Sequence, residues 1–193
     1  MTDTFKTVSD IIKKRRTVKP AKMNGMLVPD QQVMELLALG DMAPTHKHTE
    51  PWRFIVFSKD KVKKFVYSHA ELYKSVSGES FNNDKYEKII AYGNNVSHII
   101  VTVMKRDAEE RVPEIEEICS VAAAIENILI GATSLGIASF WSTGGMTHKN
   151  EFKKFLDLND KDIVIGILYL GYTDFAYESK RVIPINEKIK WNK

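Results

Sequence analysis

Four short apolar segments of this chain have the composition of β-strands, and stretches with helical spacing separate them. Aromatic and β-branched residues dominate these four segments, which are 52–57, 98–104, 137–141 and 163–170. Elsewhere apolar side chains recur at intervals of three and four residues, which predicts helices at 5–12, 29–40, 59–73, 86–92, 113–135 and 149–156. The alternation of helices with strands predicts an α/β or α+β fold and leaves the order of the strands open.

The segment 113–135 carries the longest helical signal. Its apolar residues step by three and four along the whole segment, the pattern of a helix that buries one face. Gly136 follows and is expected to end this helix. The polar segment 75–84 is expected to be a loop, and the mixed segment 172–193 to be a tail that wraps over something outside its own domain.

Composition limits the class of protein. The chain has 193 residues, of which 44% are hydrophobic and 27% charged, which suits a single soluble domain, 1–193. Its 28 Lys and Arg against 25 Asp and Glu leave a net charge of +3, too small and scattered for a nucleic-acid surface. The single cysteine, Cys119, excludes an intramolecular disulfide, and no apolar run approaches the roughly 18 residues of a membrane span. We therefore expect a cytoplasmic protein that binds neither nucleic acid nor membrane.

Common catalytic motifs are absent from the sequence. It contains no GxSxG nucleophile elbow, no GxxxxGK[ST] phosphate loop, no HExxH and no GxGxxG. His46 and His48 frame Lys47, but no third ligand has useful spacing and the lysine repels a cation, so we expect no metal site. No residue has a compelling catalytic role, and we predict none.

Three polar segments are candidates for binding a ligand. The first, 15–19, places three cations and a hydroxyl at the end of a predicted helix, which suits a phosphate monoester or simply compensates the helix dipole. The second, 43–54, is a loop between two prolines whose hydroxyl and imidazole groups suit a planar heterocycle, or it is an ordinary connection. The third, 136–145, brings a tryptophan, hydroxyls and glycines to a turn that a ring could approach, or it is a plain turn. Both interpretations stay open at each segment.

In this order and spacing, the three segments resemble the FMN-dependent nitroreductase family, and within it the small YdjA-like nitroreductases. Arg15-Arg16-Thr17 is similar to the family's Arg-Arg-Ser, and 43–56 is similar to its Ala-Pro-Ser…Gln-Pro-Trp-x-Phe motif before a strand. The segments 136–144 and 165–171 are similar to its C-terminal half. The match covers residues 8–171. Each motif is weak alone, but four in register are specific.

The resemblance implies an α+β fold with three layers, α/β/α, around a mostly antiparallel sheet. It also implies an obligate homodimer with FMN in two clefts between the subunits. The activity it implies is an NAD(P)H-dependent oxidoreductase, in which hydride passes through the flavin N5 to a nitroaromatic or quinone in a ping-pong cycle. The alternatives are a flavin-binding or sensing module with little turnover, or another flavin redox reaction on the same fold.

The resemblance also implies which residues bind the cofactor. The phosphate and ribityl end of FMN would meet Arg15, Arg16 and Thr17, and Lys180 or Arg181 would be a second phosphate-binding cation. Lys19 would approach the pyrimidine edge, where its charge favours the anionic reduced flavin.

The rest of the implied site comes from the other two segments. The other subunit would line the ring and ribityl chain with Pro44, Thr45, His46 and His48. The face of the isoalloxazine would be covered by Trp141, Ser142 and Thr143. The chain departs from many relatives at His48, where they have Asn, and at Glu50, where they have Gln. These departures put the substrate preference in question more than FMN binding.

Overall fold

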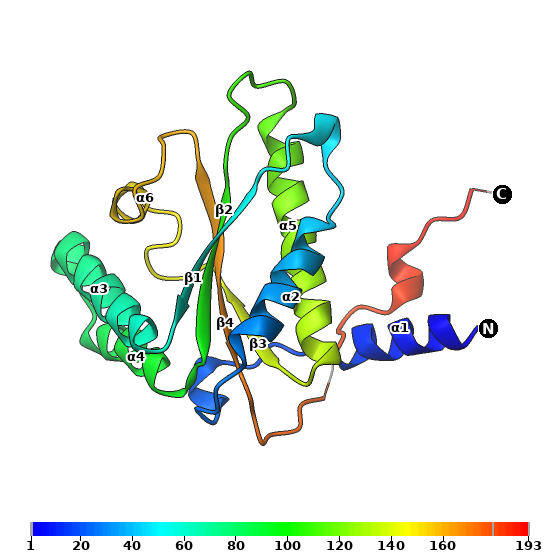
Figure 1. Ribbon diagram of the computed structural model, residues 1–193, viewed down its shortest axis with the longest axis horizontal. Coiled ribbons are helices and arrows are strands. Elements are labelled where there is room, and N and C mark those ends of the chain that lie inside the picture. Colours follow the sequence, from blue (N-terminus) through cyan, green and yellow to red (C-terminus); the bar gives the residue numbers. More distant parts are fainter. Residues whose placement is uncertain (1, 179, 193) are drawn as a thin grey trace.

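Four strands form one sheet among residues 2–178 and 180–192, which the computed structural model describes (Figure 1). Their order across the sheet is β1-β2-β4-β3. The strands are β1 (Trp52–Ser58), β2 (His98–Met104), β3 (Ala138–Ser142) and β4 (Ile163–Gly171). Each strand is antiparallel to its neighbours, and one parallel bridge joins Thr17 to Ser139. The predicted α+β class and the mostly antiparallel sheet are confirmed.

Helices cover both faces of this sheet (Figure 1). One face carries α3 (Asp60–Ser77), α4 (Asn83–Asn95) and α6 (Asn150–Phe155), and the other carries α2 (Asp30–Asp41) and α5 (Glu114–Ser134). Successive residues of β2 point to opposite faces. Ile99 and Val101 therefore pack with α3 and α4, whereas Ile100 and Met104 pack with α2 and α5. The three layers α/β/α are confirmed.

The long helix α5 packs closely on α2. At Gly131 of α5, an added Cβ atom would lie 2.6 Å from a methyl group of Leu39 and 2.9 Å from one of Leu36, so these side chains would have to shift to admit a larger residue. The predicted apolar stripe of α5 is buried. Gly136 follows the helix with a φ of +70°, the left-handed conformation expected of a residue that ends a helix.

The segment 75–84, expected to be a loop, is largely helical. α3 continues to Ser77, a 3-10 helix covers Gly78–Ser80, and α4 begins at Asn83. The side chain of Asn82 accepts a hydrogen bond from the Lys85 amide (2.9 Å) and caps α4. The Asn82 amide donates to the Tyr73 hydroxyl (3.0 Å), which ties the connection to α3. The prediction was wrong because polar side chains here cap a helix and do not merely face water.

The N-terminal and C-terminal segments extend beyond the three layers (Figure 1). α1 (Asp3–Lys14) has no buried residue, and residues 180–192, with the 3-10 helix Ile185–Lys188, are all exposed. Large apolar side chains are nevertheless exposed on both segments, namely Phe5, Val8 and Ile12 on α1 and Val182, Ile185 and Trp191 on the tail. In the described part of the chain, no helix has the length and apolar character needed to cross a lipid bilayer.

Candidate functional site

The basic segment 15–19 lies beside β3. The amide of Val18 donates to the carbonyl oxygen of Ser139 (2.9 Å), next to the bridge between Thr17 and Ser139. Ser139 precedes Trp141 by two residues on the same strand, so the first and third candidate segments are neighbours in space. Lys19 is exposed, and the Arg15 guanidinium lies 3.4 Å from the Glu126 carboxylate of α5.

The Arg16 guanidinium is hydrogen-bonded to main-chain carbonyl oxygens of the protein. Its Nε donates to the carbonyl oxygen of Tyr177 (2.8 Å), and its Nη1 donates to those of Lys13 (2.5 Å) and Arg15 (2.9 Å). These bonds close the end of α1 and hold the start of the tail against the basic segment. Lys180 and Arg181 follow three and four residues after Tyr177, so the tail leaves the body of the protein close to Arg15. Arg181 itself donates to the Lys180 carbonyl oxygen (3.3 Å).

Trp141 lies against the backbone of β4. A Cβ atom added to Gly166 would be 2.1 Å from the indole Nε1, and Nε1 donates to the Ile165 carbonyl oxygen at 3.4 Å. The register between β2 and β4 shifts at Thr102/Val103, opposite this position. Gly166 is thus required for the position of Trp141, and a glycine inside an apolar strand was the signal in the sequence for such a close approach.

The turn after β3 rests on a buried histidine, His69 of α3. The amide of Met146 donates to His69 Nε2 (3.4 Å), and the ring stacks on Phe152 at 4.8 Å between centroids. Burial lowers the pKa of His69 to about 4, since a charged imidazole would lose its hydration there. The turn itself exposes Thr143, while the Ser142 hydroxyl accepts a hydrogen bond from the Gly144 amide (3.4 Å). No local pattern in the sequence connects His69 with this turn, because 77 positions separate it from Met146.

The loop between α2 and β1 has a strained backbone. Lys47, His48 and Glu50 have φ of 51°, 52° and 41°, a left-handed conformation that costs a side-chain-bearing residue free energy. Contacts within the loop and with its surroundings fix it there. Thr45 Oγ1 accepts from the Glu50 amide (3.1 Å), and Lys47 Nζ donates to the Arg111 carbonyl oxygen (3.0 Å).

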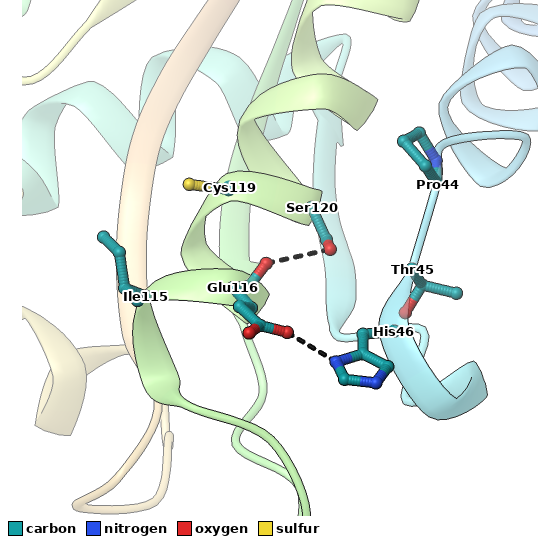
Figure 2. A pocket seen from close by; sticks show the side chains of 7 residues that line it. All are labelled: Pro44, Thr45, His46, Ile115, Glu116, Cys119 and Ser120. Carbon is teal, nitrogen blue, oxygen red and sulfur yellow. Dashed lines mark hydrogen bonds and ion pairs between the residues drawn. The ribbon is translucent and has the colours of Figure 1, made fainter.

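This loop and the first turns of α5 line a shallow, open pocket of about 390 Å³ (Figure 2). The pocket is lined by Pro44, Thr45, His46, Ile115, Glu116, Cys119 and Ser120. His46 Nδ1 lies 2.6 Å from the Glu116 carboxylate, whereas Cys119 turns its sulfur away from His46 (Figure 2). His48 is exposed and does not line the pocket. Glu116 was missed in the sequence because seventy positions separate it from His46.

A buried ion pair supports the loop that leads into α5. Glu117 is 1% exposed and accepts hydrogen bonds from the Arg106 guanidinium and from the Asp107 amide (3.1 Å). Arg106 also donates to the Val112 carbonyl oxygen (2.8 Å). This loop contains Arg111, whose carbonyl oxygen binds Lys47, so the ion pair supports the pocket indirectly.

The candidate residues fall into two groups at opposite ends of α5 (Figure 1). Glu116, at the N-terminal end, contacts His46, whereas Thr133, at the C-terminal end, lines a second pocket with Arg16. A helix rises 1.5 Å per residue, so Glu116 and Thr133 are roughly 25 Å apart along α5. Arg15 meets the helix nearer its middle, at Glu126, which is roughly 15 Å from Glu116 on the same rise. Within one chain, His46 and Arg15 therefore contact α5 at separate positions.

Comparison with known proteins identifies the family. The sequence profile described as "Nitroreductase family" matches residues 12–172. The chain belongs to the nitroreductase family. This confirms the resemblance that the three segments indicated.

Individual nitroreductases are similar along nearly the whole chain. YfhC of Bacillus subtilis (strain 168), which carries a provisional NAD(P)H nitroreductase name, is 26% identical over 93% of this chain and 91% of its own. A nitroreductase-like protein from Bacillus cereus has a solved structure that matches with a TM-score of 0.79, at 24% identity over 96% of each chain. A nitroreductase with bound FMN from Bacteroides fragilis matches with a TM-score of 0.71, at 20% identity over 96% of this chain and 98% of its own. These structures confirm the nitroreductase fold.

Proposed function

We propose that this protein is an FMN-dependent NAD(P)H oxidoreductase that reduces a nitroaromatic or quinone in a ping-pong cycle. Family membership and the FMN bound to the Bacteroides fragilis neighbour support the proposal. The observation that carries it is the position of Arg15, Thr17 and Lys19, which backbone bonds to β3 hold next to Trp141. This arrangement combines cations for a phosphate with an aromatic side chain for a planar ring.

The donor set fits FMN. The contact of Arg15 with Glu126 is partly exposed, and such ion pairs contribute only about 0–1 kcal/mol, so a phosphate can replace the carboxylate. Thr17 follows Arg15 by two residues and could add its hydroxyl, and Lys180 or Arg181 would add a second cation from the tail. Arg16 is not proposed to contact the phosphate directly, because its Nε and Nη1 already donate hydrogen bonds to carbonyl oxygens. We propose that Arg16 positions the phosphate site through the backbone.

The remaining residues orient the flavin ring and leave room for substrates. Lys19 would lie at the pyrimidine edge, where a positive charge stabilises the anionic reduced state. Trp141, Ser142 and Thr143 would cover one part of the ring, and Pro44, Thr45, His46 and His48 of a second copy would line another. When bound, FMN supplies the chemistry of accepting hydride from NAD(P)H and passing it on.

The distance between the two groups supports a homodimer. Two copies packed with α5 helices antiparallel would bring the His46 end of one to the Arg15 end of the other, and a twofold axis would create two such sites. Exposed apolar side chains on α1 and α2, among them Phe5, Ile12, Met34 and Leu39, would supply the surface for this contact. We propose that the whole chain, 1–193, acts as one FMN-binding domain whose tail, 172–193, wraps over the partner.

The state of the flavin tests the function. The visible spectrum of the purified protein is recorded, and NADPH or NADH is then added anaerobically. We expect about one FMN per chain that bleaches on addition of the nucleotide, followed by turnover with a quinone or nitro compound. A bound flavin that neither nucleotide reduces would instead favour the binding module. A protein that takes up no FMN would contradict both.

Sedimentation tests the homodimer. Ile12→Glu places a charge on the exposed apolar face of α1 and should yield monomers with little FMN. Tyr67→Glu is the control, because Tyr67 is similarly exposed but lies on α3, on the far side of the sheet. Dimers of I12E with normal FMN content would contradict the proposed interface.

A further inference from the structure

His46 and Glu116 form a histidine–carboxylate pair in the pocket at the N-terminal end of α5 (Figure 2). Nδ1 lies 2.6 Å from the carboxylate oxygen Oε2. An ionised carboxylate can only accept, so the hydrogen of this contact belongs to Nδ1. The second ring nitrogen, Nε2, is then the atom that can release or take up a proton. Figure 2 shows it on the side of the ring away from Glu116.

The backbone on both sides of the pair is anchored. The next residue, Lys47, is held in a left-handed conformation and bound to the Arg111 carbonyl oxygen (3.0 Å). On the other side, the Ser120 hydroxyl donates to the Glu116 carbonyl oxygen (2.9 Å) within α5 (Figure 2). A strained loop is maintained only where its surroundings impose it, and such strain concentrates at functional sites. The backbone that carries the imidazole is thus anchored, and the 2.6 Å contact with Glu116 orients a ring that is itself 56% exposed.

The rest of the pocket is mostly apolar and leaves Nε2 for a ligand. Pro44, Ile115 and Cys119 line it, and its volume of about 390 Å³ is in the range of small-molecule sites. The Ser120 and Thr45 hydroxyls already have partners within the protein. Among residues 2–178 and 180–192, His46 Nε2 has no hydrogen-bond partner. An aromatic compound in this pocket would find its polar contact at His46.

We propose that His46, oriented by Glu116, donates the proton that the oxygen of an aromatic acceptor requires when it is reduced. This inference rests on the proposed function, which supplies the hydride. A quinone gains two electrons and one hydrogen as hydride. The donor is the imidazolium form of His46, which keeps the Nδ1 hydrogen bonded to Glu116 and carries a second proton on Nε2. Transfer of the Nε2 proton completes the hydroquinone and leaves a neutral imidazole, which takes up a proton from water. His46 is the catalytic residue of this step, and Glu116 is a positioning residue.

The choice of acceptor separates proton transfer from electron transfer. A naphthoquinone needs a proton to become a hydroquinone, whereas ferricyanide takes single electrons and needs none. The flavin of the intact protein is reduced with dithionite, and its reoxidation by each acceptor is followed in one turnover and expressed per bound FMN. Because NAD(P)H is not used, a failure of the nicotinamide reaction does not affect this measurement.

Glu116→Gln is the principal variant, because it keeps the shape of the side chain and removes the charge that orients His46. We expect the ratio of quinone rate to ferricyanide rate to fall at least about tenfold, within the usual contribution of a general acid. Glu114→Gln is the matched control. It removes the same charge two residues before Glu116, and the Glu114 side chain does not line the pocket. His46→Gln should lower the ratio as Glu116→Gln does. In heavy water, only the quinone reaction of the unaltered protein should slow.

The outcomes separate this inference from the proposed function. A protein that binds no FMN contradicts both. A bound flavin whose rate ratio is unchanged in E116Q and H46Q overturns the proton donor and leaves the proposed function intact. Equal losses with both acceptors also overturn it, because the pair would then only position the cofactor.

Discussion

The indole of Trp141 rests on the backbone of Gly166, which lies on the neighbouring strand β4. A Cβ atom at position 166 would be 2.1 Å from Nε1 and 2.5 Å from Cδ1, well inside the contact distance of any carbon atom. Trp141 is one of the residues proposed to cover the flavin. Its strand, β3, is hydrogen-bonded to β4 along its whole length. The position of a cofactor residue thus depends on a glycine without polar chemistry of its own.

We predict that Gly166→Ala displaces Trp141. The overpacked core should lower the free energy of unfolding by about 1–3 kcal/mol and weaken FMN binding at the same time. Denaturant unfolding, tryptophan fluorescence and an FMN titration check this. Gly144→Ala is the control for stability, because a Cβ atom there would lie no closer than 3.8 Å to another atom. Unchanged fluorescence in G166A would show that Trp141 does not depend on this contact.

His69 should make the fold sensitive to acid. Its pKa is about 4 in the folded protein and about 6.5 when unfolded, so the unfolded chain binds more protons between these values. The stabilisation from neutral His69 is therefore complete above pH 6.5, decreases as the pH falls, and is lost by about pH 4. The full difference is about 3 kcal/mol.

The variant His69→Phe tests this pH dependence. It keeps a ring against Phe152 but cannot take up a proton, and it also leaves the Met146 amide without its acceptor. Denaturant unfolding at pH 7 and pH 4.5 should show a larger acid-induced loss for the unaltered protein than for the variant. Parallel losses in both proteins would assign the acid sensitivity to other groups.

The strands and the long helix could be predicted because the spacing of apolar residues within each segment indicates its secondary structure. β2 was predicted with both ends correct, since all seven residues are buried and five of them are apolar, with only His98 and Thr102 polar. The α3–α4 connection was not, because its outcome depends on the side chain of Asn82 acting as a cap. A polar residue before a polar segment looks the same whether it caps a helix or faces water.

The candidate site could be predicted only as separate segments. The sequence indicated the segments around Arg15, His46 and Trp141 but not their partners, because Glu116, Tyr177 and Gly166 are distant in the chain from the residues they contact. Contacts at such separations depend on how helices and strands pack. No local pattern encodes them.

The buried pair of Arg106 and Glu117 should matter more to stability than any exposed ion pair nearby. Glu117→Gln removes the buried counter-charge of a guanidinium that is 9% exposed and leaves it only the more distant Glu110, at 3.9 Å, which should cost about 3 kcal/mol. Arg111→Gln breaks an ion pair with Asp107 in which the arginine is 42% exposed, and should cost about 1 kcal/mol or less. Chemical denaturation measures both. Similar losses would mean that burial does not decide the strength of these pairs.

Arg15 should bind the phosphate of FMN and not its ring. A charge-assisted hydrogen bond contributes about 1.5–3 kcal/mol, so Arg15→Gln should weaken FMN binding by roughly 10–100-fold. Riboflavin has the same ring without the phosphate, and its affinity for the variant should match that for the unaltered protein. Arg16→Gln removes the same charge one residue away. Because the Arg16 donors bind carbonyl oxygens, including that of Tyr177, this change should lower the melting temperature more than Arg15→Gln does. Fluorescence titrations with both flavins decide the matter: an equal loss of riboflavin and FMN affinity in R15Q would place Arg15 away from the phosphate.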